Sequence, residues 1–245
     1  MTDHSKRDNI YAAPRGTVSG FVFDGRVAKV FSDMISRSVP GYATVINMTS
    51  VLANQYVQAD SRCYDLGCSL GASSMAMQSG IRVPGCNIIA VDNSQAMLEQ
   101  AERHLAAADE SPPIELICSD VMDLPLENAS MVVLNFTLQF IPPERRLELL
   151  QRIHDALRPG GILVLSEKIA FEDPEEERLQ IEMHHAFKRA NGYNELEISQ
   201  KRTALENVMI PETLAIHKER LGSAGFSRAD LWFQCFNFVS LVAHR

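Results

Sequence analysis

The sequence has no excess of positive charge and no long apolar run. Its 23 lysines and arginines stand against 31 aspartates and glutamates, a formal net charge of −8. A surface that binds nucleic acid needs clustered cations, so we expect no direct nucleic-acid contact. No apolar stretch reaches the roughly 18 to 20 residues of a membrane span, and MTDHSKRDNIYAAP lacks the apolar core of a signal peptide. These absences predict a cytoplasmic protein that does not bind membranes.

The sequence also lacks the spacings of a metal site. No CxxC or Cys/His pattern occurs, and the adjacent His184 and His185 cannot share a helical face as a metal-binding pair at i, i+4 would. We therefore expect no metal. Five cysteines in or beside predicted strands are expected to be reduced, buried thiols: Cys63, Cys68, Cys86, Cys118 and Cys235.

Hydrophobic residues make up 46% of the chain, enough for a full core, and their pattern alternates between strand and helix. The expected strands are 62–66, 87–91, 114–119, 131–136 and 161–167, and the expected helices of this core are 71–80, 94–108 and 143–157. Alternation of this kind predicts an α/β domain with a parallel sheet. We place this single domain at 23–245.

Three segments lie outside the regular alternation. Residues 1–22 are polar and aperiodic, and we expect a flexible arm without detectable chemistry. Residues 23–60 predict a helical cap, and the charged segment 168–210 is too long for a simple connection and predicts a helical lid. In the lid, EDPEEER is typical of a helix start with Asp173 as N-cap. Four lid cations could form a solvated face or bind anions: Lys188, Arg189, Lys201 and Arg202.

The stretch YDLGCSLGAS, 64–73, runs from an apolar strand through a small-residue turn into a helix start. Gly67 and Gly71 allow a tight turn and a close approach of a ligand, with Ser69 where a third glycine often stands. The N-terminus of the following helix could receive a negative group. The pattern predicts a nucleotide-type site, although a glycine turn alone is weak evidence.

The second strand ends at Asp92, 21 residues after Gly71, where an acid can accept both hydrogens of a ribose diol. Neither GxGxxG nor GxxxxGK[ST] occurs, and Asp65 beside the turn would repel a pyrophosphate. An adenine, a ribose and a sulfonium amino acid fit this acid-lined site better than a dinucleotide. We therefore predict S-adenosylmethionine as the ligand, against the alternative that Asp65 and Asp92 merely cap strands.

Polar residues also end the next two strands. Asp120 follows 114–118 and could accept the adenine amino group, and Asn135 follows 131–134. Each has a structural alternative, since Asp and Asn favour strand exits. Because ligands of open α/β sheets bind at the carboxyl ends of the strands, Gly67, Asp92, Asp120 and Asn135 are predicted to meet in one crevice.

After an expected helix over 211–223, the tail LWFQCFNFVSLVAHR predicts two antiparallel strands with a tight turn at Asn237. An antiparallel edge hairpin after a parallel core is typical of the S-adenosylmethionine-dependent methyltransferase fold. The expected fold is thus Rossmann-like class I, with a seven-stranded, mostly parallel sheet, an N-terminal helical cap and a helical insertion.

Several strings resemble one family across all but about the first 20 residues. They are RSVPGY (37–42), YDLGCSLGA (64–72), VDNS (91–94), ENASMVVLNFTLQF (127–140), MHHAFKRANGYNELEISQKRTALENVM (183–209) and LWFQCFNF near the end. The chain resembles the carboxy-S-adenosyl-L-methionine synthases. The resemblance implies a methyltransferase fold that joins the carboxyl carbon of prephenate to the methyl group of S-adenosylmethionine and releases phenylpyruvate.

The resemblance also implies site residues. Cofactor contacts are implied for Tyr42, Gly67, Cys68, Ser69, Asp92, Asn93, Asp120, Val121 and Asn135, and Arg202 is implied to hold the added carboxylate. An ordinary methyl donor has no carboxylate at sulfur and would gain nothing from an arginine there. The other lid cations could hold the two carboxylates of prephenate, and no residue is assigned as a general base.

The resemblance further implies a homodimer, and a product that a separate tRNA carboxymethyltransferase uses to make 5-oxyacetyluridine at the wobble position. Two other functions stay open on the residues alone. One is an ordinary methyltransferase, for which the glycine turn and Asp92 would look the same. The other is an inert S-adenosylmethionine-binding partner protein.

Overall fold

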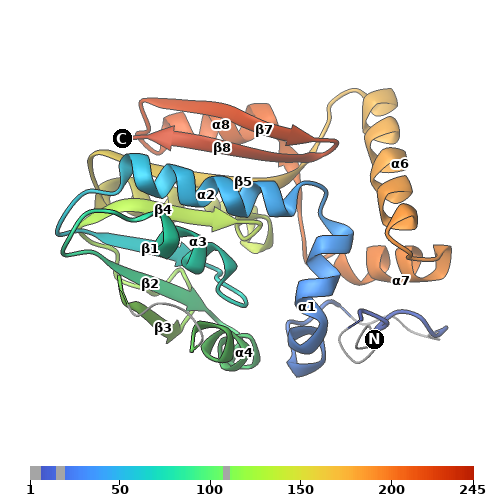
Figure 1. Ribbon diagram of the computed structural model, residues 1–245. Coiled ribbons are helices and arrows are strands. Elements are labelled where there is room, and N and C mark those ends of the chain that lie inside the picture. Colours follow the sequence, from blue (N-terminus) through green and yellow to red (C-terminus); the bar gives the residue numbers. More distant parts are fainter. Residues whose placement is uncertain (1–6, 15–19, 107–110) are drawn as a thin grey trace.

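The computed structural model describes residues 7–14, 20–106 and 111–245. Its sheet runs in the order β3-β2-β1-β4-β5-β8-β7, with β6 paired to β5 (Figure 1). The strands are β1 (Arg62–Leu66), β2 (Asn87–Asp92), β3 (Ile114–Cys118), β4 (Ala129–Asn135), β5 (Leu157–Ala170), β6 (Glu212–Thr213), β7 (Arg228–Cys235) and β8 (Phe238–His244). β1 to β6 pair in parallel, and β8 pairs antiparallel with β5 and β7. The mostly parallel sheet with an antiparallel C-terminal hairpin is confirmed.

One strand was not predicted. Residues 211–213 were expected to begin a helix, but Glu212 and Thr213 pair with Ile169 and Ala170 and form β6. The main path has the seven predicted strands, and β6 makes the sheet eight-stranded. The pairing also explains why the C-terminal end of β5 extends beyond the predicted residue 167, since Ile169 and Ala170 have a partner strand of their own.

The helices are α1 (Gly25–Ser38), α2 (Tyr42–Tyr56), α3 (Ala72–Gly80), α4 (Gln95–Leu105), α5 (Pro143–Ala156), α6 (Pro174–Ala190), α7 (Glu195–Leu205) and α8 (Leu214–Ser223), with a 3-10 turn at Leu138–Phe140. α4 ends at Leu105 rather than 108, and 107–108 lie outside the described residues. The Asp173 carboxylate accepts from the Glu175 N–H at 2.9 Å, so EDPEEER is a capped helix start as predicted.

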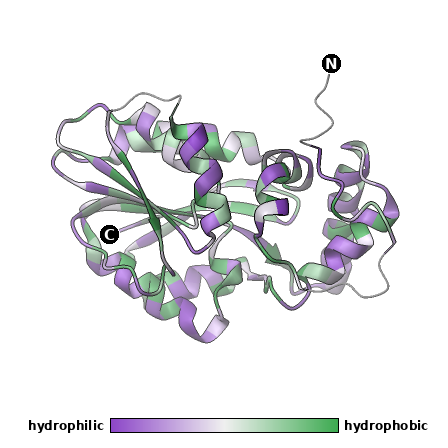
Figure 2. Cartoon of the chain, turned by 90° about the horizontal axis from the view of Figure 1, so that it is seen from below, coloured by the Kyte–Doolittle hydropathy of each residue, from purple (hydrophilic) through white to green (hydrophobic). Residues whose placement is uncertain are grey.

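Side chains alternate between two buried layers because successive strand residues point to opposite faces. Cys63, Met131 and Val164 pack with Met77 of α3 and Ala53 of α2 on one face. The other face packs Tyr64, Leu66, Val132 and Leu134 against α5 and α8. In Figure 2 the central strands are mostly green, as expected for a sheet covered on both faces. No helix in the described ranges is long and apolar enough to cross a membrane.

Of the lid predicted at 168–210, residues 168–170 end β5, and α6 and α7 form the lid beyond the carboxyl ends of the parallel strands and next to α1 (Figure 1). The asparagine N-cap of α7, Asn194, exchanges hydrogen bonds with Glu197 in a capping box. The lid therefore consists of regular, capped helices that stand over the end of the sheet where the predicted site residues lie.

The expectation of a flexible arm over 1–22 needs correction for its described part. Asp8, Tyr11 and Phe21 are buried, and Tyr11 and Phe21 pack with Met34 of α1 and Ala204 of α7. The sparse apolar residues of this segment have no period of their own, because they complete a cluster formed by other elements. Residues 1–6 and 15–19 lie outside the described part of the chain.

Candidate functional site

A cavity of about 850 Å³, here called the ligand cavity, lies between the carboxyl ends of the strands, the cap and the lid. Its volume is within the usual range for small-molecule sites. All ten predicted site residues line it: Tyr42, Gly67, Cys68, Ser69, Asp92, Asn93, Asp120, Val121, Asn135 and Arg202. The structure thus brings the predicted set together around one space, while the role of each residue stays a prediction.

The glycine turn is tied to the neighbouring strand by backbone hydrogen bonds. The N–H groups of Gly67 and Cys68 donate to the Val91 carbonyl at 2.8 and 2.9 Å. Gly67 and Ser69 both have positive φ, 84° and 50°, so the chain turns sharply without a third glycine. The Ser69 N–H donates to Asp92 Oδ2 at 2.9 Å, which couples the turn to the end of β2.

Asp92 is buried at the end of β2, where its carboxylate organises the site. Its Oδ1 accepts from the Ser94 N–H at 2.9 Å, in addition to the Ser69 bond at Oδ2. Burial raises the pKa of Asp92, and the two N–H bonds oppose that rise. Each oxygen keeps a free lone pair, so the carboxylate can still accept two hydroxyl hydrogens.

Asp120 lies just beyond the end of β3, Asn135 ends β4, and both line the cavity. The Asp120 carboxylate is exposed and accepts from the Met122 N–H at 2.8 Å, and Val121 beside it is buried. The Asn135 amide donates to Ser73 Oγ at 2.9 Å and accepts from Ser166 Oγ at 2.6 Å. Asp120 can therefore reach a ligand, and Asn135 is held rigidly by its neighbours.

Asp65 does not belong to the cavity wall, which corrects the expectation of an acid directly beside the ligand. It is fully buried under α3, and Ser74 Oγ donates to it at 2.6 Å. Burial raises the pKa of Asp65 to about 7, although its hydrogen bonds from Ser74 oppose this. Alternation along β1 turns Asp65 toward the helix, so the capping interpretation holds for Asp65.

Apart from Tyr42, the sequence analysis did not predict the aromatic wall of the cavity. Phe23 meets Phe21 and Phe140 edge to face at 5.0 and 5.4 Å between ring centroids, and Tyr42 lies 6.4 Å from Phe136. Burial raises the pKa of the Tyr42 phenol, so it stays protonated. These rings come from the cap, from the turn after β4 and from the N-terminal segment. The sequence signal for these rings was the pair of phenylalanines in FVF at 21–23.

The four lid cations separate into two groups. Arg189 is exposed and pairs with Glu195 at 3.1 Å. Of the four cations, it is the one that fits the predicted alternative of a solvated face. Lys188 and Lys201 are buried, and both line the cavity together with the exposed Arg202. Lys168 at the end of β5 and Arg145 of α5 also line it and were missed. Lys168 could have been found by the pattern that predicted the other site residues, because it directly follows the predicted strand 161–167.

The cysteines agree only in part with the expectation that all five are buried, and His184 is held by a hydrogen bond. Cys118 is exposed and Cys235 is partly exposed, whereas the other three cysteines are buried, and all five are free thiols. His184 donates its Nε2–H to the Ser38 carbonyl at 2.8 Å, and burial holds its pKa far below the usual value. Among the described residues, no cluster of His, Cys, Asp and Glu could hold a metal ion.

Gly67→Ala is expected to lower the free energy of unfolding by about 2 to 4 kcal/mol and to weaken S-adenosylmethionine binding. A Cβ there would overlap the Thr137 side chain, and alanine is strained at this φ. Gly71→Ala is the control, since its φ is also positive but its nearest neighbour, Leu105, lies at an ordinary 3.7 Å. Urea unfolding and ligand titration measure both. Equal losses in the two variants would contradict the crowding argument.

The fold and the site define a class. Residues 64–161 match the family model described as a methyltransferase domain. The structure is similar to human N-acetylserotonin methyltransferase in complex with S-adenosylmethionine, with a TM-score of 0.61 and 19% identity, over 90% of this chain and 55% of that one. The chain therefore has the class I methyltransferase fold.

Closer relatives identify the family. The chain is 61% identical to a carboxy-S-adenosyl-L-methionine synthase of Citrifermentans bemidjiense, over 98% of this chain and 99% of the relative. It is 62% identical to the synthase of Trichlorobacter lovleyi, over 97% and 98%. The chain belongs to the carboxy-S-adenosyl-L-methionine synthase family and is a transferase. The resemblance stated from its sequence strings is confirmed.

Proposed function

We propose that this enzyme makes carboxy-S-adenosylmethionine from S-adenosylmethionine and prephenate, and releases phenylpyruvate. The observation that supports this most directly is the place of Arg202. Its side chain lines the same cavity as Asp92, and in the described chain no acidic residue pairs with it. A free guanidinium near the sulfonium can bind the carboxylate of a carboxylated ligand. An ordinary methyl donor has no carboxylate at that place and gains nothing from it.

The reaction that we propose balances as follows. Prephenate loses its ring carboxylate as carbon dioxide and its ring hydroxyl as hydroxide, which leaves the aromatic phenylpyruvate. Hydroxide removes a proton from the sulfonium methyl group and becomes water. The resulting carbanion takes up the carbon dioxide, so that one C–C bond forms and a carboxylate appears beside sulfur.

The protein contributes confinement and orientation in this proposal. Carbon dioxide must be captured before it escapes, which favours a closed site with few waters. The aromatic wall and the lid supply such surroundings, and His184 is a poor base because burial lowers its pKa far below the usual value. Arg202 would stabilise the carboxylate as it forms.

We further propose that the enzyme works as a homodimer and does not itself contact nucleic acid or a membrane. Its product would go to a separate tRNA carboxymethyltransferase that completes 5-oxyacetyluridine at the wobble position. The location in the cytoplasm stays a prediction of the sequence.

The protein purified from cells that make prephenate is expected to contain a sulfonium nucleoside heavier than S-adenosylmethionine by one carboxyl group. Native mass spectrometry of the intact complex, followed by analysis of the released ligand, measures this. Finding S-adenosylmethionine or S-adenosylhomocysteine alone would favour an ordinary methyltransferase. Bound ligand with no turnover of added prephenate would favour an inert binding protein.

A further inference from the structure

Lys188 of α6 is a buried lysine of the ligand cavity that lacks a partner. It is 7% exposed and lines the cavity. Across residues 7–14, 20–106 and 111–245, no hydrogen bond or ion pair reaches its ammonium group. Burial, together with the charges of Lys201 and Lys168, lowers the pKa of Lys188 to about 7, against a smaller opposing effect of Asp8. A buried charge without a partner is costly, and a bound anion would offset that cost.

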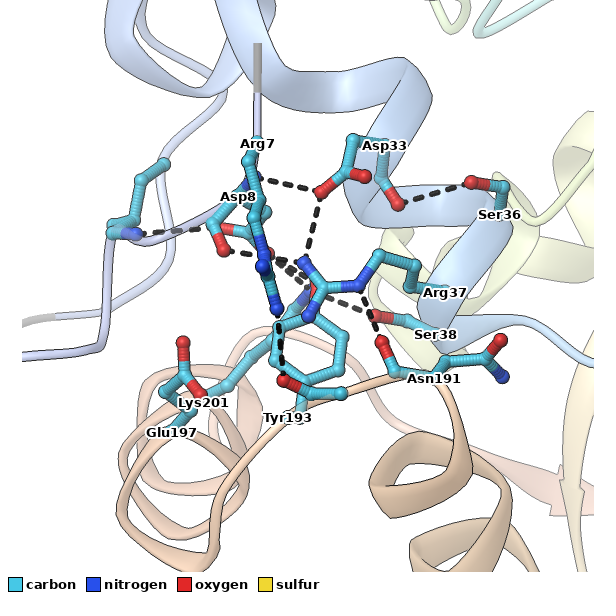
Figure 3. A network of polar contacts seen from close by, with 12 residues as sticks. Arg7, Asp8, Asp33, Ser36, Arg37, Ser38, Asn191, Tyr193, Glu197 and Lys201 are labelled. Carbon is cyan, nitrogen blue, oxygen red and sulfur yellow. Dashed lines mark hydrogen bonds and ion pairs between the residues drawn. The ribbon is translucent and has the colours of Figure 1, made fainter. Parts of the chain in front are cut away.

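Lys201 offers an internal comparison, because it is equally buried but has partners (Figure 3). Its Nζ lies 3.5 Å from Asp8 Oδ2 and donates to Ser38 Oγ at 3.0 Å. The Tyr193 hydroxyl donates to the same Asp8 oxygen at 2.5 Å. The N-terminal segment thus neutralises Lys201, and no described side chain does the same for Lys188.

The lid side of the cavity has more positive than negative charge. Its cations are Lys168, Lys188, Lys201 and Arg202, of which Asp8 neutralises Lys201, whereas its acids are Glu177 and Glu206. Burial lowers the pKa of Lys168 too, as does the charge of Arg202, while Glu177 opposes this. A ligand with two carboxylates would bring the negative charge that this part of the cavity lacks.

We propose that Lys188 anchors a carboxylate of the second substrate, and that it takes up a proton from solvent as that carboxylate binds. The proposal rests on the proposed function, which supplies a dicarboxylate as the second substrate. It assigns a specificity role to a residue other than Arg202, whose partner is the carboxylate formed at the sulfonium.

The surroundings of Lys188 set the direction of the proton movement. The charged and titratable groups that interact with it from its own and neighbouring elements are Asp8, Lys168, His184, His185 and Lys201. The pKa values of His184 and His185 are lowered, chiefly by burial, so neither histidine supplies charge near neutral pH. At pH 8, above its pKa of about 7, Lys188 of the free enzyme is therefore mostly the amine. A carboxylate raises its pKa and draws in a proton.

The binding test is a calorimetric titration of prephenate into the enzyme saturated with S-adenosylhomocysteine, which has no methyl group to react. At pH 8 in Tris and in HEPES, the wild type should show a buffer-dependent enthalpy that corresponds to net proton uptake. Lys188→Met should bind prephenate about tenfold to hundredfold more weakly and without proton uptake. Lys188→Arg should keep part of the affinity but take up no proton, because arginine is always charged.

Kinetics and stability provide the controls. Lys188→Met should raise KM for prephenate by a similar factor and leave S-adenosylmethionine affinity within about twofold. Its ligand-free melting temperature should rise by a few degrees, since a buried amine without a hydrogen-bond partner is replaced by an apolar side chain. Arg189→Met, which changes the exposed neighbour paired with Glu195, should alter none of these values.

The outcomes separate this proposal from the proposed function. No carboxylated product from the wild type would overturn the proposed function. Product from the wild type together with an unchanged KM in Lys188→Met, or a wild-type binding enthalpy that does not depend on the buffer, would overturn the Lys188 proposal alone. A lowered melting temperature with equal losses for both substrates would make Lys188 a structural residue.

Discussion

Asp92→Ala is expected to abolish measurable binding of S-adenosylmethionine. Two buried ribose hydroxyls would lose their common acceptor, at about 1 to 3 kcal/mol each, which weakens binding at least thirtyfold. The N–H groups of Ser69 and Ser94 would lose their acceptor as well, which loosens the glycine turn. Calorimetric titration of S-adenosylmethionine and of S-adenosylhomocysteine into the folded variant measures the effect.

Two further variants refine the Asp92 test. Asp92→Asn keeps the shape but replaces one acceptor with an amide donor, so an intermediate loss is expected. Asp120→Ala is the matched control, because Asp120 is exposed and would accept a single adenine amino group. Its loss should stay near 1 kcal/mol. Unchanged affinity in Asp92→Ala would place the ribose elsewhere in the cavity.

Arg202→Ala is expected to weaken carboxy-S-adenosylmethionine binding by about tenfold to hundredfold and to leave S-adenosylmethionine almost unaffected. A charge-assisted, bidentate pair with the added carboxylate is worth about 1.5 to 3 kcal/mol, and only the carboxylated ligand can make it. Synthesis from prephenate should fall too, because the same contact stabilises the carboxylate that forms. Two titrations and one turnover assay measure these effects.

The pattern among Arg202 variants separates recognition from folding. Arg202→Lys should recover part of the affinity, since lysine keeps the charge but not the planar guanidinium. Arg189→Ala, thirteen residues earlier in the lid, should leave both ligands bound as in the wild type. Equal weakening of both ligands in Arg202→Ala would make Arg202 a structural lid residue, and no weakening would refute its role in recognising the product.

The cofactor side of the cavity was predictable because it depends on local order along the chain. Gly67, Asp92, Asp120 and Asn135 each stand at the end of a strand, and parallel strands end at one edge of their sheet. Strand periodicity and the turn residues are readable in the sequence, so the grouping of these four follows from topology alone. Asp65 was not placed correctly by this argument, because the alternation of side chains along β1 turns it away from the cavity and toward Ser74.

The lid side was only partly predictable because it depends on contacts between distant segments. The cations Lys188, Arg189 and Lys201 look alike in the sequence, yet Arg189 faces solvent and the two lysines are buried. Asp8 and Lys201 are 193 residues apart, and no local pattern indicates that a polar N-terminal stretch would supply the acid for one lysine and leave the other without. Strand order and turns therefore follow from short-range preferences, whereas the charge state of the lid follows from burial, which exists only once the chain has folded.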